Sequence, residues 1–254
     1  MQTLTIDWPD LPAGVGVLST LRSGGVSVGP YGATGDHGGG LNLGLHVGDE
    51  PAAVEQNRRL LRANLPAEPA WLAQVHGTRV LDLSSEYDPL TVSEADASIA
   101  RRPDHVCTIM SADCLPVLLA DCRGTHVGAA HAGWRGLAQG VIEQTVAAMR
   151  ASGANQLTAW LGPAIGPEAF EVGIEVRRAF AHLGPQAEAA FMPVPDKADK
   201  FLADLAGLAR LALLRSGVTQ VSGGQDCTVS DPAKFYSFRR DQVTGRMASL
   251  IWIK

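Results

Sequence analysis

Short apolar runs, each bounded by turn-forming residues, dominate the middle of the chain. Between residues 70 and 131 these runs are interrupted by Gly, Pro, Asp or Ser, a pattern typical of strands. The predicted strands in this stretch cover residues 71–75, 79–83, 105–110, 115–120 and 125–130. Similar runs predict later strands over residues 157–161, 218–222 and 248–253.

Helical spacing is found on both sides of this region. Apolar residues recur at three- and four-residue intervals over residues 135–151 and 201–214, which predicts two amphipathic helices, and a shorter helix is predicted over 173–181. Pro51 marks another helix start, because proline fits the first helical turn. Residues 29–40 (GPYGATGDHGGG) are too rich in glycine for a regular element and predict a loop.

The order of these elements predicts the fold class. Strands are grouped early and helices are interspersed later, which favours an α+β fold with mixed sheets over a regular alternation of strand and helix. No internal repeat or long linker divides the 254 residues, which are enough to bury a substantial apolar core. We therefore expect residues 1–254 to form a single domain.

Charge and composition exclude several classes of protein. The chain has 21 Lys and Arg against 26 Asp and Glu, a net charge of −5, so we expect no sequence-independent binding of nucleic acid. No apolar run reaches the roughly 20 residues of a membrane helix, and the start MQTLTIDWPD lacks the pattern of a signal peptide. We expect a cytoplasmic protein with no membrane partner, in which the four cysteines are reduced.

Three segments each place a potential metal ligand beside small residues. QVHG contains His76, SADCLP contains Cys114, and AAHAGWRG contains His131. Each ligand falls at a predicted strand end or turn, where side chains from different strands can converge. Alternation along the strand puts His126 on the face opposite to His131, so we do not expect His126 to share the site.

Two imidazoles and one thiolate form a three-ligand set that leaves the fourth tetrahedral position open, which is typical of catalytic zinc. Such an ion lowers the pKa of bound water toward neutrality. Each residue alone has a structural alternative, since Cys114 can be a small core residue and His76 and His131 can be hydrogen-bonded core groups. Without a C-x-x-C or H-E-x-x-H pattern, spacing leaves both interpretations open.

Seven segments, in order along the chain, carry a resemblance to a known family. They are NLGLHVGD (42–49), QVHG (74–77), ADA (95–97), SADCLPV (111–117), HAGWRG (131–136), LGPAIG (161–166) and FYSFRRD (235–241). Together they resemble the bacterial laccase-domain family, also called multicopper polyphenol oxidase laccases and now classed as purine nucleoside phosphorylases. The similarity covers nearly the whole chain, and the combination of SADCLP with HAGWRG is highly specific.

The resemblance implies a cofactor, a function and a fold. The family's metal ligands match His76, Cys114 and His131, and the implied ion is zinc, with copper as the alternative. The implied activities are phosphorolysis of adenosine, inosine and methylthioadenosine, together with adenosine deamination, so purine nucleosides and phosphate are the expected partners. The implied fold has mixed β-sheets in α/β/β/α layers, related to a toxin family with a cysteine–histidine deamidase centre. Some members are described as peptidoglycan editing factors that remove a misincorporated serine from a cell-wall precursor.

Several arginines are candidates for binding the substrates. Arg135 follows glycine and tryptophan at a predicted helix start, where it could clamp a phosphate, and a solvated arginine is the alternative. Arg239 and Arg240 form a second cationic option, with surface ion pairing as the alternative for at least one of them. Asn42 and Arg22 are candidates for lining the purine or ribose pocket.

Deamination also needs a carboxylate that moves protons. Asp113, next to the cysteine ligand, and Asp96 are the two candidates, and the sequence does not distinguish between them. Asp113 serves equally well as a turn residue.

Three other classes of protein stay open as alternatives. A multicopper laccase needs many histidines, commonly in H-x-H pairs, and this chain has seven histidines and no such pair, so copper would at most support weak oxidase activity. A metal-free hydrolase would use Cys114 as nucleophile and His131 as its base, which suits the serine-removing role. The third alternative is a non-enzymatic binding module.

Overall fold

Two neighbouring strands at the centre of the molecule consist of continuous apolar runs, because both of their faces are covered. β8 (Leu115–Asp121) and β9 (Val127–Ala132) are buried at every position and pair in antiparallel fashion. They form the middle of a six-stranded sheet in the order β14-β10-β8-β9-β6-β5. The remaining strands of this sheet are β14 (Gln220–Gly223), β10 (Leu157–Leu161), β6 (Ala97–Ala100) and β5 (Val80–Asp82).

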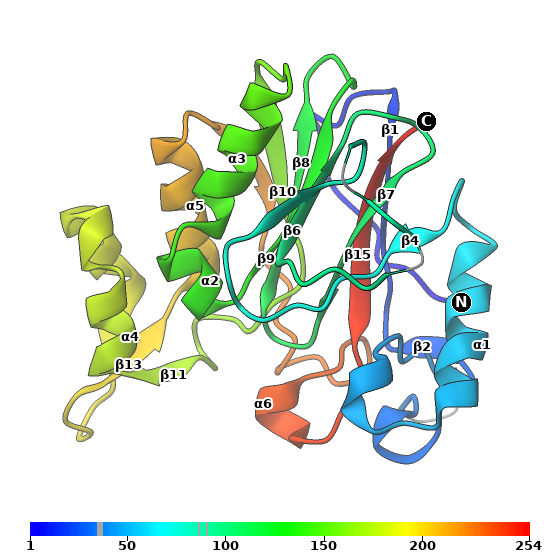
Figure 1. Ribbon diagram of the computed structural model, residues 1–254. Coiled ribbons are helices and arrows are strands. Elements are labelled where there is room, and N and C mark those ends of the chain that lie inside the picture. The colour runs from blue at the N-terminus through cyan, green and yellow to red at the C-terminus, as the bar shows by residue number, and fades with distance from the viewer. Residues whose placement is uncertain (35–37, 86, 90) are drawn as a thin grey trace.

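A second sheet, of four strands, packs against the first. Its order is β1-β15-β7-β4, with β1 (Val15–Ser19), β15 (Met247–Ile253), β7 (Val106–Ser111) and β4 (Pro69–Ala70). β15 pairs with β1 on one side and with β7 on the other, so the last strand of the chain holds the N-terminal strand in the sheet (Figure 1). This computed structural model describes residues 1–34, 38–85, 87–89 and 91–254.

Helices cover the outer faces of both sheets and complete four layers. α2 (Trp134–Ala138), α3 (Val141–Ala151) and α5 (Leu205–Arg215) share an apolar cluster with the outer face of the six-stranded sheet. A second cluster, which includes Ile109 and Leu118, fills the space between the sheets. On the far side, α1 (Pro51–Arg62) packs Leu61 against residues of β7 and β15. This arrangement confirms the expected α+β fold with mixed sheets in α/β/β/α layers.

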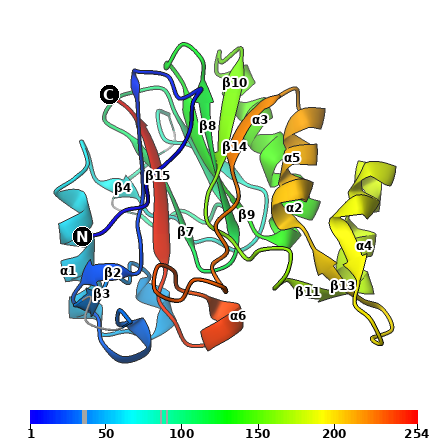
Figure 2. The same cartoon turned by 180° about the vertical axis from the view of Figure 1, so that it is seen from behind.

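The remaining elements are short and lie at the periphery. β11 (Glu171–Gly173), β12 (Phe191–Pro193) and β13 (Lys200–Ala203) form a small sheet with α4 (Ile174–Ala179), and Figures 1 and 2 show this group beside α5. β2 (Ser23–Gly25) pairs with β3 (Gly39–Gly40), and α6 (Phe238–Asp241) precedes the last strand. The 3-10 helices cover Gly29–Tyr31, Leu45–Val47, Ala181–Leu183 and Pro185–Ala190.

Several predicted elements differ from the structure for identifiable reasons. The helix predicted over 135–151 is two helices, because Gly140 has a φ of 93° and ends the first of them. The helix predicted over 201–214 begins as strand β13, and α5 starts only after Asp204, whose side chain accepts a hydrogen bond from the backbone N–H of Gly207. In the segment predicted as loop over 29–40, residues 35–37 lie outside the described residues.

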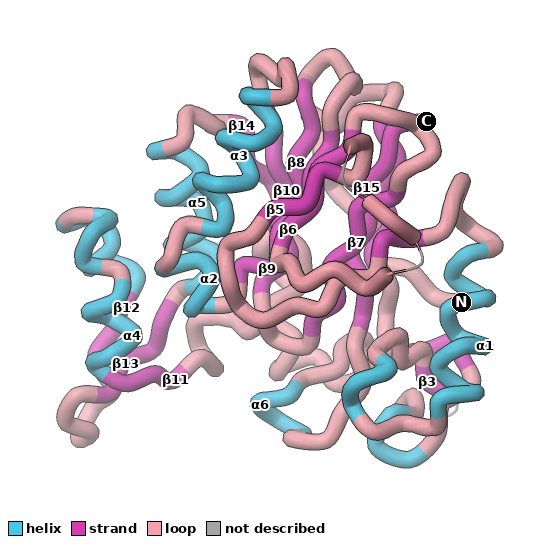
Figure 3. Tube along the Cα trace, viewed as in Figure 1, coloured by secondary structure: helices cyan, strands magenta, loops and turns pink. Residues whose placement is uncertain are grey.

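The strand predicted over 71–75 is wrong, and this error concerns the functional site. Only an isolated bridge between Ala73 and Glu94 is present there. The side chain of Gln74 instead forms two hydrogen bonds with the backbone of Met110, so a side chain takes the place of a strand partner. Figure 3 shows loop segments gathered at the end of the two sheets that lies between α2 and α6. No helix within the described ranges has both the length and the hydropathy to cross a bilayer.

Candidate metal centre

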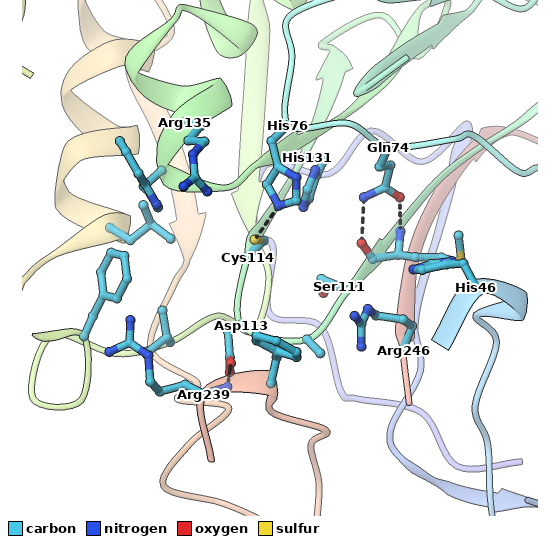
Figure 4. Close-up of a pocket in the computed structure, with 17 residues that line it drawn as sticks. His46, Gln74, His76, Ser111, Asp113, Cys114, His131, Arg135, Arg239 and Arg246 are labelled. Atoms are coloured by element: carbon cyan, nitrogen blue, oxygen red, sulfur yellow. Dashed lines mark hydrogen bonds between the residues drawn. The ribbon is translucent and has the colours of Figure 1, made fainter. Parts of the chain in front are cut away.

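Three side chains from separate loops and strand ends meet at this end of the sheets. His76 lies in the loop between β4 and β5, Cys114 in the turn between β7 and β8, and His131 near the end of β9. One potential ligand atom from each residue lies within 4.8 Å of the other two. Figure 4 shows His76 and His131 side by side above the Cys114 sulfur.

The distances suit a bound metal ion. The Cys114 Sγ atom is 3.7 Å from Nε2 of His76, whereas tetrahedral zinc with Zn–S of about 2.3 Å and Zn–N of about 2.0 Å separates such atoms by roughly 3.5 Å. The rings of His76 and His131 have centroids 4.9 Å apart and an interplanar angle of 64°, so both can direct a nitrogen at one point. His131 is buried and His76 is exposed, so a fourth position can face the solvent side.

The carboxylate of Asp96, just before β6, holds two of the three ligands in place. Its Oδ1 atom accepts hydrogen bonds from Nδ1 of His131 at 2.8 Å and from the backbone N–H of His76 at 2.9 Å. Its Oδ2 atom accepts from the backbone N–H groups of Gly77 at 2.7 Å and Val75 at 3.1 Å. Because Nδ1 of His131 donates to Asp96, Nε2 of His131 is left to face the site.

These four bonds keep Asp96 charged although it is fully buried. Burial by itself raises the pKa of the Asp96 carboxyl, but the hydrogen bonds from His131, Gly77 and Val75 outweigh this and lower it. A buried carboxylate is therefore available to stabilise a positive charge at His131.

Backbone conformation and the absence of one side chain make room for the ligands. His76 has a φ of 63°, an uncommon value for a residue other than glycine, and the bonds to Asp96 fix the loop that contains it. A Cβ atom at position 133 would lie 2.8 Å from the sulfur of Cys114 and 3.1 Å from Cδ2 of His76. Gly133 in the HAGWRG segment therefore allows the ligands to approach the backbone.

Cys114 and His131 form a charge pair when no metal is bound. Burial raises the pKa of the Cys114 thiol, but the His131 imidazolium and hydrogen bonds from His131 and His76 outweigh it and lower the pKa to about 6. For His131, burial lowers the pKa, whereas the thiolate and the bond to Asp96 raise it to about 9. Between these values the thiolate form, which is the metal ligand, predominates.

The three residues line a cavity of about 420 Å³, which is large enough for a small organic substrate. One part of its wall is apolar and includes Trp134, Ile165, Phe170, Leu205 and Phe238. The other lining residues are His46, Gln74, His76, Met110, Ser111, Ala112, Asp113, Cys114, His131, Arg135, Arg239 and Arg246. The cavity thus combines apolar surface with three cations and a metal-binding cluster.

Asp113, a predicted catalytic residue, lines the cavity but has both carboxylate oxygens engaged. Oδ1 accepts a hydrogen bond from Oγ1 of Thr228 at 2.5 Å, and Oδ2 accepts from the backbone N–H of Arg239 at 2.6 Å. Its backbone has a φ of 91°, and its carbonyl accepts a hydrogen bond from the N–H of Ile165. These contacts fix the turn that carries Cys114.

The other predicted substrate-binding residues divide into two groups. Arg135 lines the cavity at an exposed position, with its guanidinium 4.6 Å from the ring centroid of Trp134. Asn42 and Arg22 do not line it. Asn42 is fully buried and hydrogen-bonded, and Arg22 donates to the carbonyl groups of Pro232 and Gly32.

Sequence reasoning missed several residues of the cavity wall. Neither Arg246 nor His46, both of which line the cavity, is among the residues predicted to bind substrate. The Thr-Gly-Arg run before β15 contains no feature that links it to a site more than a hundred residues away. Cys107 is fully buried between the two sheets, where burial raises the pKa of its thiol to about 12.

Comparison with known sequences supports the resemblance over almost the entire chain. The multi-copper polyphenol oxidoreductase laccase family matches residues 16–254. A purine nucleoside phosphorylase of Pseudomonas aeruginosa is 53% identical over 251 residues, which cover 99% of this chain and 98% of that protein. The purine nucleoside phosphorylase YfiH of Escherichia coli is 51% identical over 248 residues, covering 97% of this chain and 96% of that one.

Solved structures share the same fold. A DUF152-family protein of Neisseria meningitidis superposes with a TM-score of 0.89 at 47% identity and covers 99% of both chains. YlmD of Geobacillus stearothermophilus superposes with a TM-score of 0.84 at 30% identity, covering 97% of this chain and 94% of that one.

Replacement of Asp96 by asparagine tests whether this carboxylate holds the ligands. An amide has one acceptor oxygen, so at least one N–H group would lose its partner, and His131 would lose its anion. We expect metal affinity to fall roughly 10- to 100-fold and the free energy of unfolding to fall by about 1–3 kcal/mol. The measurements are competition with a chelator and urea denaturation. Asp104→Asn, which changes a surface carboxylate paired with Arg102, is the control, and equal affinities for both variants would contradict the assignment.

The charge pair predicts how the metal-free protein reacts with iodoacetamide. Alkylation of Cys114, followed by peptide mapping, should reach half its maximal rate near pH 6, fall below that pH as the thiolate is protonated, and stay level above it. Exposed Cys122, whose pKa is raised by burial and by Asp121, should react appreciably only at alkaline pH and serves as internal control. His131→Gln should move the midpoint for Cys114 upward. An unchanged midpoint in that variant would disprove the pairing.

Proposed function

The chain belongs to the multi-copper polyphenol oxidoreductase laccase family, and from that premise we propose that it is a metal-dependent purine nucleoside phosphorylase. The observation that carries the proposal is that His76, Cys114 and His131 converge in one cavity beside an apolar wall and three arginines. Such a cavity offers a flat base an apolar surface and offers phosphate several cations. The names of relatives that are 44–53% identical to this chain support the same reaction.

The ion we propose is zinc. Two imidazoles and one thiolate with a fourth position open form the ligand set of catalytic zinc sites. Copper also binds such ligands, but a multicopper oxidase needs several clusters, and the described part of the chain contains one group of histidine, cysteine or acidic residues with metal-binding spacing. A phenol oxidase activity would therefore be secondary.

In the proposed reaction an oxygen of phosphate bonds to C1′ of the ribose while the bond from C1′ to the purine nitrogen breaks. The electron pair of the broken bond stays on the base, which takes up a proton, and the products are the free base and ribose 1-phosphate. His76, Cys114 and His131 would hold a divalent ion, which would supply a Lewis acid for the charge that develops during this step. Trp134 and Phe170 on the apolar wall orient the base by stacking.

Two predicted residues take supporting roles in this scheme. We assign Arg135 to substrate contact, since it lines the cavity at an exposed position and its guanidinium rests on Trp134. Asp113 positions the Cys114 turn and, through the backbone of Arg239, the start of α6. Adenosine, inosine and methylthioadenosine are the proposed substrates, and the proposed compartment is the cytoplasm.

Adenosine deamination is a weaker candidate activity in this cavity. Zinc deaminases use a carboxylate to move protons between water and the leaving amine. Among the described residues that line the cavity, Asp113 is the only carboxylate, and both of its oxygens already accept hydrogen bonds. The geometry therefore favours phosphorolysis over deamination.

A second candidate function follows from the chain of contacts that runs from Cys114 to His131 and from His131 to Asp96. A thiolate beside an imidazole that is itself oriented by a carboxylate is the arrangement of cysteine hydrolases. In a metal-free state the Cys114 thiolate would attack an amide carbonyl, the amine would leave with a proton from His131, and water would then hydrolyse the thioester. Removal of serine from a cell-wall precursor is an amide hydrolysis of this kind. A trapped acyl-enzyme on Cys114 would identify that activity.

Incubation of the zinc-loaded protein with adenosine, with and without phosphate, tests the proposal. We expect free adenine and ribose 1-phosphate only when phosphate is present. Cys114→Ala should lose both the bound metal and turnover, whereas Cys122→Ala, which removes an exposed cysteine outside the cavity, should keep both. Inosine formed regardless of phosphate would indicate deamination, and full activity of a metal-free preparation would contradict the metal-dependent mechanism.

A further inference from the structure

The cations of the cavity lie on two sides of the metal-binding cluster. Figure 4 shows Arg135 and Arg239 on one side of Cys114, and Arg246 with His46 on the other. Ser111 is drawn between Cys114 and Arg246. We propose that Arg246, with His46 and Ser111, forms the site that binds phosphate. This proposal rests on the proposed function and adds the residues that recognise one of its two substrates.

Arg246 is a half-buried cation whose backbone is held by a hydrogen bond and whose guanidinium has hydrogen-bond donors that are available to a ligand. Its backbone N–H donates to Oδ1 of Asn42 at 2.8 Å, and Nη1 donates to the carbonyl groups of Thr244 and Gly245. Within the described ranges Arg246 forms no ion pair, and no hydrogen bond from Nε or Nη2 is found. Two donors of a guanidinium with this fork geometry match two oxygens of a phosphate.

The environment of Arg246 makes an anion favourable there. Burial lowers the pKa of its guanidinium, and the acidic groups Cys114, Asp113 and Tyr31 oppose this shift only in part. A partly desolvated charge without a carboxylate partner is stabilised when an anion of suitable shape occupies the adjacent space. That space is part of the cavity that contains the metal-binding cluster.

Gly44 and Asn42 provide the second line of evidence, because they shape the place where Arg246 lies. A Cβ atom at position 44 would stand 2.9 Å from Cγ of Arg246 and 3.4 Å from Cε1 of His46. The Asn42 side chain accepts hydrogen bonds from the N–H of Gly44 and from that of Arg246, so it joins the two segments. The NLGLH segment thus positions Arg246 and His46 side by side. Asn42 acts by holding Arg246 in place and does not itself line the cavity.

The other two arginines are less suited to hold phosphate. The guanidinium of Arg135 rests on the ring of Trp134 at an exposed position, where water screens its charge. The guanidinium of Arg239 lies 5.4 Å from the ring centroid of Phe170 and donates to the carbonyl of Glu171. Both therefore belong to the aromatic side of the cavity, where the base is expected.

His46 offers a direct readout of binding. Burial lowers the pKa of its imidazole, and the positive charges of Arg246 and Arg58 lower it further. A phosphate dianion bound at Arg246 adds a negative charge next to this ring and should raise the pKa of His46. The shift can be followed by NMR titration of the imidazole and does not depend on turnover.

Kinetics and binding of inorganic phosphate to the zinc-loaded enzyme test the proposal. For Arg246→Met we expect the KM for phosphate to rise roughly 10- to 100-fold, as the loss of a charge-assisted bidentate contact implies, with the KM for adenosine changed less than about twofold. Arg246→Lys should give a KM for phosphate between those of the unaltered protein and Arg246→Met, because an ammonium group cannot form the two parallel hydrogen bonds of a guanidinium. Arg102→Met, which removes a surface cation paired with Asp104, is the matched control.

The same set of variants separates the two hypotheses. Zinc content and the unfolding midpoint show whether Arg246→Met is folded. Gly44→Ala, which displaces the Arg246 side chain without removing it, should also weaken the binding of phosphate and raise its KM. If phosphate shifts the pKa of His46 only when Arg246 is present, but no nucleoside is turned over, the phosphate site is supported and the proposed phosphorylase activity is disproved. Normal phosphorolysis with an unchanged KM for phosphate in Arg246→Met would overturn the assignment of Arg246 as the phosphate-binding residue. So would a rise in the KM for phosphate that is found only in Arg135→Met.

Discussion

The hydrogen bonds of the buried Asp96 carboxylate are the interaction on which the candidate metal centre depends. The carboxylate accepts three backbone N–H groups from the loop of His76 and a fourth bond from the ring of His131. A single negative charge thereby sets the path of one loop and the tautomer of one ligand. Because these four hydrogen bonds stabilise the buried negative charge in place of water, the carboxylate stays ionised and fixes the loop of His76 and the ring of His131.

The layered fold explains why the ligands meet at one end of the sheets. The turn between β7 and β8 passes from the four-stranded to the six-stranded sheet, and Cys114 lies in that turn. β9 runs beside β8 and brings His131 to the same end, opposite Pro116. Small residues there, above all Gly133, leave space that larger side chains would fill. The site therefore depends on strained or glycine-containing turns supported by rigid strands.

The parts of the site that could be predicted from sequence are the residues that short local segments of the chain identify. His76, Cys114 and His131 each stand beside small residues at a strand end, and the structure brings them together. From sequence Asp96 is predicted only as a proton carrier, because a carboxylate that acts through backbone N–H groups of another loop leaves no local pattern. Arg246 was missed for a similar reason, since its link to Asn42 spans 204 positions.

Zinc K-edge X-ray absorption of the loaded protein measures the coordination shell itself. With His76, Cys114 and His131 as ligands, the shell should contain one sulfur at about 2.3 Å and nitrogen or oxygen neighbours at about 2.0 Å, four ligands in all. The sulfur contribution should disappear in Cys114→Ala. A shell without sulfur in the unaltered protein, or one with two sulfurs, would contradict the proposed metal centre.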